Sequence, residues 1–437
     1  MDVVVEALLT PDLLPLVAAF QDGTYEDAHL FCSFTRRRAL PAQLDVFNST
    51  AILHEFNHLL SLWGQAHKVD FASDSALPPR LLQLCRCVPA LPRYLVLHAT
   101  FFGHMKILVH LHKTIGPLQG TFPHDNLLDV AAFHGQLETL VYLDSLGHPG
   151  CTTRAMDVAA QANHMDIVAF LDTHRTEGGT EWAMNGAAYH GHLDMVEWLH
   201  THRSEGCTSS AMDCAAQFNH LGIVKFLHSH RTEGCTTKAM DYAAANGHLK
   251  VVQFLHDHRT EGATHQAMEW AAKNNHATVV RFLHRHREEG SITVALKVAA
   301  AHGHVQVVNY LLAHAQVACG RMHMEAAAAN GHLDMVKFLL PKCKGECTTR
   351  AMDKAAANGH LEVVQFLDRG HRGCLSDRPR SRLLTDRLLV DAKGHVVCET
   401  SNAAKLADVR GHGHVATYLK FTAPRTIEMD DRICIVM

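Results

Sequence analysis

Apolar and polar positions follow a period of 28 residues over most of the chain. Eight consecutive repeats open at these positions: Cys151, Gly179, Cys207, Cys235, Ala263, Ser291, Cys319 and Cys347. In the repeat from Cys235, the apolar residues of 239–244 are spaced as on one face of a helix, and a second stripe covers 249–255. Asn246-Gly247 lies between the stripes, where a helix interior is unfavourable. Each repeat is therefore predicted to be two short helices.

Two further features recur in every repeat. A pair of small residues stands in the first helix: Ala159-Ala160, Ala187-Ala188, Ala215-Ala216, Ala243-Ala244, Ala271-Ala272, Ala299-Ala300, Ala327-Ala328 and Ala355-Ala356. An aromatic stands in the second: Phe170, Trp198, Phe226, Phe254, Phe282, Tyr310, Phe338 and Phe366. Small pairs let helices approach closely, and the aromatics are expected to fill the space between repeats. The predicted fold is all-α, a solenoid of stacked helix-turn-helix repeats with a helical N-terminal region.

The repeat resembles the ankyrin-repeat family, whose pattern is T-P-L-H-x-A-A-x-x-G-H-x-x-V-V-x-x-L-L. Here residues 240–244 stand for L-H-x-A-A, Gly247-His248 for G-H, and 251–255 for the apolar tail. The family repeat has about 33 residues, so this is a short variant, with the missing residues expected from the β-turn finger. The family's histidine is replaced in most repeats, which leaves its hydrogen bond open: Asp157, Asn185, Asp213, Asp241, Glu269, Glu325 and Asp353.

The resemblance covers about 91–420 and divides the chain. We expect a helical N-terminal region at 1–90, the ankyrin-repeat solenoid at 91–374, an irregular linker with a degenerate terminal repeat at 375–422, and a tail at 423–437. The N-terminal helices are predicted at 13–20, 44–63 and 81–87. Residues 9–17, with 30–32 and 36–38 behind them, resemble an F-box, which implies a substrate receptor of a ubiquitin ligase. The alternative is a helical cap of the solenoid.

Composition indicates an intracellular globular protein. The 437 residues are 47% hydrophobic and 19% charged, with a formal net charge of −4, too balanced to favour nucleic acid as the main partner. The first residues are acidic where a secretory signal is basic, and 91–112, the most apolar stretch, is interrupted by charged residues and histidines. We expect a cytoplasmic monomer that is not an enzyme and has no cofactor.

Thirteen cysteines are present, and five of them open repeats. Equivalent positions in stacked repeats are roughly 8–10 Å apart, which is too far for a disulfide. Reduced structural thiols are therefore predicted.

His54-Glu55-Phe56-Asn57-His58 fits the H-E-x-x-H pattern of zinc peptidases. On a helix its two histidines share a face and can hold zinc, with the glutamate as general base. With 37 histidines in the chain, however, chance matches are common, and a third ligand would be Asp70, Asp74 or a remote residue. A zinc peptidase is thus the weaker alternative, and we predict neither a metal site nor a catalytic residue.

Histidines recur in two places in the repeats. H-x-H pairs end the second helix and are predicted to form a surface ladder, because i and i+2 point to different sides: His200/His202, His228/His230, His256/His258 and His284/His286. The Gly-His histidines follow the family pattern and are expected to make structural hydrogen bonds: His192, His248, His304, His332 and His360.

Residues 434–437 read Cys-Ile-Val-Met, a C-a-a-X sequence whose methionine favours farnesylation of Cys434. It predicts peripheral association with a membrane. The preceding Glu428, Asp430 and Asp431 are acidic where a basic second signal would help, and a single lipid binds only marginally.

Because the repeats are so regular, the residues that carry the function are expected at the positions that differ between repeats. Three such groups lie on the first helix: Arg154, Trp182, Ser210, Lys238 and Gln266; Val158, Gly186, Cys214, Tyr242 and Trp270; Tyr189, His190 and Phe218. Aromatic residues are frequent interface anchors, so the predicted partner-binding residues are Trp182, Tyr189, Phe218, Tyr242 and Trp270. The open alternative is that some of them only shield neighbouring helices. The predicted function is a scaffold that binds another protein, whose identity the sequence does not give.

Overall fold

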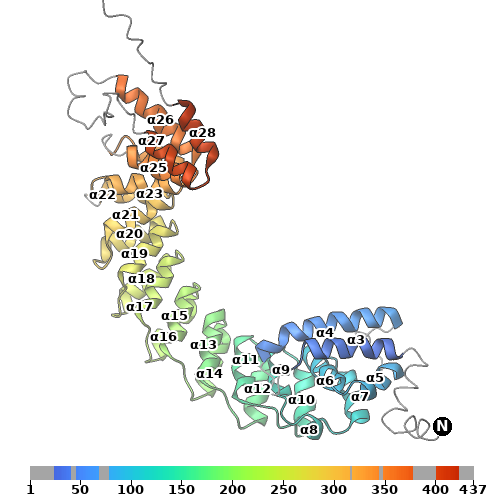
Figure 1. Ribbon diagram of the computed structural model, residues 1–437. Coiled ribbons are helices and arrows are strands. Elements are labelled where there is room, and N and C mark those ends of the chain that lie inside the picture. Colours follow the sequence, from blue (N-terminus) through green and yellow to red (C-terminus); the bar gives the residue numbers. More distant parts are fainter. Residues whose placement is uncertain are drawn as a thin grey trace, which may run out of the picture. The chain divides into compact units, whose positions relative to one another are not determined.

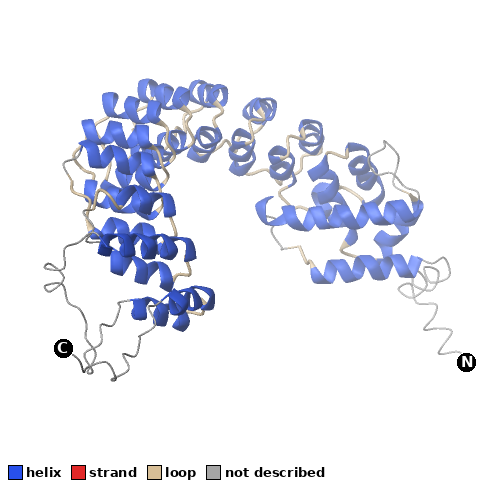
Figure 2. Cartoon of the chain, turned by 90° about the horizontal axis from the view of Figure 1, so that it is seen from above, coloured by secondary structure: helices blue, strands red, loops and turns tan. Residues whose placement is uncertain are grey.

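The computed structural model describes residues 24–40, 46–67, 78–314, 317–343, 348–376 and 400–422. Within these ranges the chain forms helices joined by loops and contains no strand (Figure 2). The all-α prediction is thereby confirmed. The chain divides into two compact units, Met1–Gly234 and Cys235–Met437, and the division falls between two repeats.

Three helices precede the repeats in the first unit: α3 (Thr24–Arg37), α4 (Val46–His67) and α5 (Pro79–Cys87). Helices α4 and α5 match two of the predicted helices, α3 was not predicted, and 13–20 lies outside the described residues. Phe31, Phe56 and Trp63 are buried, and the ring of Phe31 lies 6.2 Å from that of Phe56 and 6.3 Å from that of Trp63. This aromatic cluster gives the region its own core.

The first part of the predicted solenoid, within 91–150, is also helical: α6 (Leu91–Phe102), α7 (Met105–Ile115), α8 (Leu118–Thr121), α9 (Leu127–Phe133) and α10 (Leu137–Ser145). Helix α6 packs with α7, and α9 packs with α10. Helix α4 packs against both α6 and α9, and α9 in turn packs against α11 of the first regular repeat. The N-terminal helices therefore continue directly into the stack.

The regular repeats of the first unit are three helix pairs: α11 (Thr153–Gln161) and α12 (Met165–His174), α13 (Glu181–His190) and α14 (Leu193–His202), α15 (Ser209–Gln217) and α16 (Leu221–His230). Each first helix packs against the first helix of the next repeat, from α9 through α11 and α13 to α15 (Figure 1).

The second unit continues the same pattern: α17 (Thr237–Ala245), α18 (Leu249–His258), α19 (His265–Lys273), α20 (Ala277–His286), α21 (Ile292–Ala301), α22 (Val305–His314), α23 (Arg321–Ala329), α24 (Leu333–Leu339), α25 (Thr348–Ala357), α26 (Leu361–Ser376), α27 (Thr400–Val409) and α28 (Gly413–Thr422). Within this unit the odd-numbered helices pack in one row and the even-numbered helices in a second (Figure 1). Helices α27 and α28 pack together and close the stack.

The core of each repeat consists of small and aliphatic side chains. In the repeat from Cys235, the side chains of Met240, Ala243 and Ala244 are at most 1% exposed. The recurring aromatics, which were expected to fill the space between repeats, are half-buried, except for Tyr310, which is buried. The ring of Phe254, for example, is covered by His258 at 4.3 Å. Close approach at the alanine pairs leaves the large ring at the edge of the core.

In several repeats the acid of the first helix hydrogen-bonds to the next repeat. The carboxylate of Asp157 accepts the backbone N–H and the hydroxyl of Thr180, both at 2.8 Å. Thr180 is the N-cap of α13, so the acid also supports the start of the next helix. Asn185 contacts Thr208 at the same two groups: its Oδ1 accepts the backbone N–H, and its Nδ2 donates to the hydroxyl, each at 3.0 Å. The histidine of the family pattern is thus replaced by a link between repeats.

The loop between one repeat and the next, where a shortened β-turn finger was expected, contains charged residues that pair with one another. Arg203 donates to Asp172 of the preceding repeat at 2.7 Å and to Glu205 at 2.5 Å. Glu205 also accepts the backbone N–H of Gly179, which opens the same repeat, at 3.3 Å. We call this arrangement the Arg-Glu clamp. It recurs at Arg175/Glu177, Arg231/Glu233, Arg259/Glu261 and Arg287/Glu289.

One expectation about the cysteines is wrong. Cys319 and Cys343 form a disulfide, whereas reduced thiols were predicted throughout. The spacing argument compared equivalent positions in neighbouring repeats, but these two cysteines occupy different positions of a single repeat, 24 residues apart. Among the cysteines whose side chains are described, these form no disulfide: Cys32, Cys85, Cys87, Cys151, Cys207, Cys214 and Cys235.

Candidate functional site

The first unit carries three exposed aromatic side chains at its predicted binding positions. Trp182 and Tyr189 lie two turns apart on α13 and are 67% and 43% exposed. Phe218, at the end of α15, is 38% exposed, and its ring centroid lies 4.5 Å from that of Tyr189. We call Trp182, Tyr189 and Phe218 the first aromatic patch. Burial of these rings by a partner would remove a large apolar area from water.

The second unit brings together the other two predicted residues. Tyr242 on α17 and Trp270 on α19 are half-buried, and their rings stack in parallel with centroids 5.7 Å apart. Lys238 precedes Tyr242 by one turn, and Lys273 follows Trp270 by nearly one turn. We call this group the second aromatic patch. Each ring covers part of the other, so these two residues also shield neighbouring helices, which was the alternative to a role in binding.

Two exposed apolar residues were missed by the sequence analysis. Val294 on α21 is 40% exposed and Met322 on α23 is 54% exposed. Both occupy the repeat position of Trp182, at multiples of 28 residues from it. Continuing that column beyond Gln266 would have identified them.

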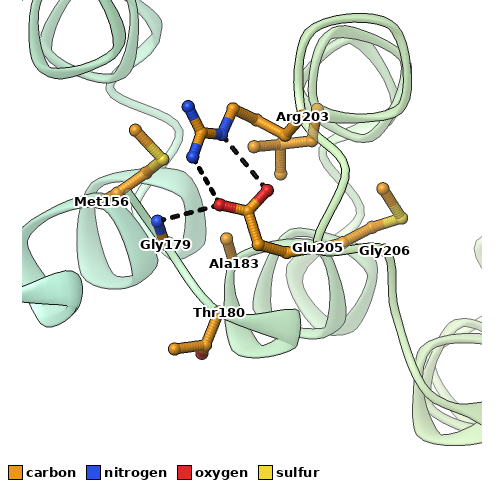
Figure 3. A pocket seen from close by; sticks show the side chains of 9 residues that line it. Met156, Gly179, Thr180, Ala183, Arg203, Glu205 and Gly206 are labelled. Atoms are coloured by element: carbon orange, nitrogen blue, oxygen red, sulfur yellow. Dashed lines mark hydrogen bonds and ion pairs between the residues drawn. The ribbon is translucent and has the colours of Figure 1, made fainter. Parts of the chain in front are cut away.

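The first unit also contains a small crevice beside the Arg-Glu clamp. Figure 3 shows Arg203 and Glu205 facing one another, with Gly179 and Met156 beside them. Its volume is about 10 Å³, enough for roughly one water molecule and far below that of a ligand pocket. The crevice is a packing feature of the clamp.

The H-E-x-x-H residues make structural contacts on α4. Glu55 accepts two hydrogen bonds from Arg38, both at 2.8 Å, and the His54 ring packs edge-on against Phe101 at 5.3 Å. No group of three potential ligands occurs in the described ranges, and Asp70 and Asp74 lie outside them. The glutamate is therefore engaged in an ion pair with an arginine.

The Gly-His histidines link neighbouring repeats, as predicted for His304 and His360. His304 Nε2 donates to the carbonyl of Lys273 at 2.6 Å, and His360 Nε2 to that of Ala329 at 3.0 Å. Burial lowers the pKa of His192 and of His332, against the opposing effect of hydrogen bonds to the carbonyls of the preceding repeat. Folding therefore favours the neutral form of His192 and of His332.

The H-x-H histidines are divided between two environments. The second members, such as His202, are exposed and stack on the aromatic four residues earlier, with 4.4 Å between His202 and Trp198. The first members are half-buried, and the His200 ring lies 5.5 Å from Phe226 of the next repeat. The surface-ladder prediction is confirmed for the second members only.

Two buried titratable groups lie near the start of the stack. His98 is buried, and its Nε2 lies 2.9 Å from Asn57 Oδ1; burial and the neighbouring His104 lower its pKa to about 3. Asp129 on α9 is fully buried and accepts the N–H and hydroxyl of Thr152 at 2.9 and 2.6 Å. Burial raises the pKa of Asp129 to about 6 despite these hydrogen bonds.

Two predicted motifs cannot be placed in full. Residues 9–17 of the F-box-like segment and the farnesylation candidate Cys434 lie outside the described residues, whereas 30–32 of that segment lies on α3 and 36–38 at its end. Among the helices that are described, none is both long and apolar enough to cross a bilayer.

Comparison with known families agrees with the repeat architecture. The family model for ankyrin repeats (3 copies) matches residues 184–266, 211–295, 240–321 and 296–374. Residues 184–374 thus consist of ankyrin repeats, which are protein-binding scaffolds and typically not catalytic. A search of curated proteins found no match.

Proposed function

We propose that this protein is a scaffold that binds another protein through the exposed side chains of its first helices. The observation that supports this proposal best is the first aromatic patch, because Trp182 is 67% exposed in a stack that buries smaller apolar side chains. Tryptophan and tyrosine are the residues most often found as energetic anchors of interfaces. In the second unit, Val294 and Met322 are exposed at the same repeat position as Trp182.

The second aromatic patch indicates the chemistry of the partner. Lys238 and Lys273 lie about one turn from the rings of Tyr242 and Trp270 on the same two helices. Two cations beside a stacked tyrosine and tryptophan suit a segment that combines an apolar side chain with acidic residues. Such charges contribute mainly to the association rate and to specificity.

Comparative affinity purification tests this proposal. Wild-type protein and the variants Trp182→Ala and Trp270→Ala are used as baits from the same cell extract, and captured proteins are quantified by mass spectrometry. A partner of this surface should fall at least about tenfold with either variant, since anchor residues contribute roughly 2 kcal/mol or more. The thermal midpoint of both variants should remain close to that of the wild type.

Phe282→Ala provides the matched control. Phe282 lies on second helix α20 and stacks on His286 at 4.4 Å, outside the proposed binding face. Its removal should lower stability and leave partner capture unchanged. Equal capture by all three variants, or collapse of the two tryptophan variants on heating, would show that the binding surface lies elsewhere.

Two further functional predictions concern residues outside the described ranges. Farnesylation of Cys434 would tether the scaffold to a membrane. An F-box that includes 9–17 would instead make the protein a substrate receptor of a ubiquitin ligase. The full-length protein should then co-purify the adaptor subunit of the ligase, and a variant lacking residues 1–23 should not.

A further inference from the structure

Repeats that open with a cysteine place its sulfur beside the clamp arginine of the same repeat. Cys151 contacts Arg175, Cys207 contacts Arg231, and Cys235 contacts Arg259. Burial nevertheless raises the pKa of the Cys151 thiol to about 12 and that of Cys207 to about 11. These thiols remain protonated at neutral pH and are poor nucleophiles.

The repeat that opens with Cys319 differs at the arginine position. Its residue at that place is Cys343, which follows Cys319 at the same separation of 24 residues and forms a disulfide with it. The Cα atoms are 5.2 Å apart, within the normal range for disulfides. A disulfide therefore occupies the place of the Cys–Arg contact.

The Arg-Glu clamp is missing from this part of the array. Gly345 stands where the clamp glutamate would be, and the preceding repeat has Ala315 and Val317 at its two clamp positions. The disulfide thus links the beginning and the end of the repeat from Cys319, whereas in the repeat from Gly179 the backbone N–H of the opening residue donates to the clamp glutamate.

The two sulfurs differ in their access to solvent. Cys343 is 5% exposed, whereas Cys319 lies in a partly exposed loop. A thiolate reductant can attack Cys319 Sγ, which forms a mixed disulfide and releases Cys343 as the thiolate. A second reductant thiolate then frees Cys319, and the reductant leaves as its own disulfide.

We propose that Cys319 and Cys343 form a reversible redox site that closes this repeat in place of the Arg-Glu clamp. The oxidant is of the hydroperoxide or low-molecular-weight disulfide class. With a hydroperoxide, one thiolate takes the terminal peroxide oxygen to give a sulfenic acid and an alcohol, and the second thiol displaces water to form the disulfide. Reduction leaves the repeat without either link, so it opens more readily.

Hydrogen exchange on the full-length protein tests this site. The protein is equilibrated in oxidised or in reduced glutathione, and linkage of Cys319 to Cys343 is checked by peptide mapping without reduction. In the reduced sample, exchange in α21 to α24 should be faster by on the order of 10- to 100-fold, as expected when a loop of this length loses its crosslink. Helices α17 to α20, which carry intact clamps, should exchange equally in both samples.

Two variants separate the redox site from a general thiol effect. Cys343→Arg combined with Gly345→Glu restores the clamp sequence and should protect α21 to α24 equally in both buffers. Cys235→Ser, at the corresponding position of a clamped repeat, should retain the redox difference of the wild type. The proposal is overturned if no Cys319–Cys343 peptide forms in oxidised glutathione, or if exchange of the wild type does not depend on its redox state.

Discussion

Replacing Asp129 by asparagine is expected to stabilise the protein at neutral pH. The ionised carboxylate is fully buried, and its pKa rises from 3.8 to about 6. This difference of about 2 pKa units corresponds to roughly 3 kcal/mol by which folding disfavours the charged form. Asparagine carries no charge and can retain both contacts with Thr152, as Asn185 does with Thr208 at 3.0 Å.

The sign of the effect follows from the raised pKa. Asp129 is protonated more readily in the folded state than in the unfolded state. It therefore contributes stability that is fully present below pH 3.8 and is lost as pH rises through about 6. Asp129→Asn should therefore increase the free energy of unfolding by about 2–3 kcal/mol at pH 8 and change it little near pH 4. Asp129→Ala should instead lower it by about 2–4 kcal/mol, since the buried N–H of Thr152 loses its acceptor.

Local hydrogen exchange is the appropriate assay, because a long repeat array need not unfold in one step. Protection of α9 and α11 is compared at pH 8 and pH 5 for both variants, with rates corrected for intrinsic exchange. Asn185→Asp is the reciprocal control, and should reduce protection of α13 and α15 more at pH 8 than at pH 5. If Asp129→Asn destabilises α11 as much as Asp129→Ala does at pH 8, the charge is essential to the link and the reasoning from burial is refuted.

Three other outcomes are expected. In the Asp129→Asn variant, the free energy of unfolding should fall as pH drops below 6.5, because folding lowers the pKa of His98 to about 3 and that of His134 to about 4. A denaturation midpoint that stays constant from pH 7 to 4 would contradict this prediction. Arg203→Ala should lower the free energy of unfolding by about 1–2 kcal/mol in denaturant melts. Arg203→Lys should restore less than half of this loss, because lysine lacks the planar guanidinium group that makes paired hydrogen bonds; full restoration would show that this geometry is not needed. Mass spectrometry of protein from a eukaryotic host should show a farnesylated Cys434 without the last three residues, and an unmodified cysteine would refute that prediction.

The arrangement of the helices could be predicted because every repeat shows the same pattern of apolar residues. Eight copies of the same apolar spacing, each interrupted at Asn-Gly or an equivalent pair, leave little choice but two short stacked helices. Gly247 has a φ of +80°, and the equivalent Asn219 has a φ of +66°, so the interruption marks a left-handed helix end. Helix α3 occurs once and has no repeat to support its prediction.

The contacts between repeats could not be predicted in the same way. Asp157 and Thr180 are 23 residues apart, and Arg203 and Asp172 are 31 apart, so each pairing depends on how two helices are oriented. Spacing alone shows that these residues recur but does not show which of them meet. The same limitation explains the disulfide, since Cys319 and Cys343 occupy different positions of their repeat.

The candidate surface was predicted in outline by the positions that vary. The exposed fractions of Trp182, Tyr189 and Phe218 show that these side chains face solvent, whereas the stacking of Tyr242 on Trp270 could not be predicted from their spacing. Their role in binding a partner remains a prediction.

The link from an acid to the threonine of the following repeat gives the chain a direction during synthesis. Asp157 leaves the ribosome 23 residues before Thr180, the residue that it binds. Each completed repeat can therefore present a ready acceptor to the next helix as that helix emerges. Assembly from the N-terminus would then proceed one repeat at a time, with every new helix starting on a template already in place.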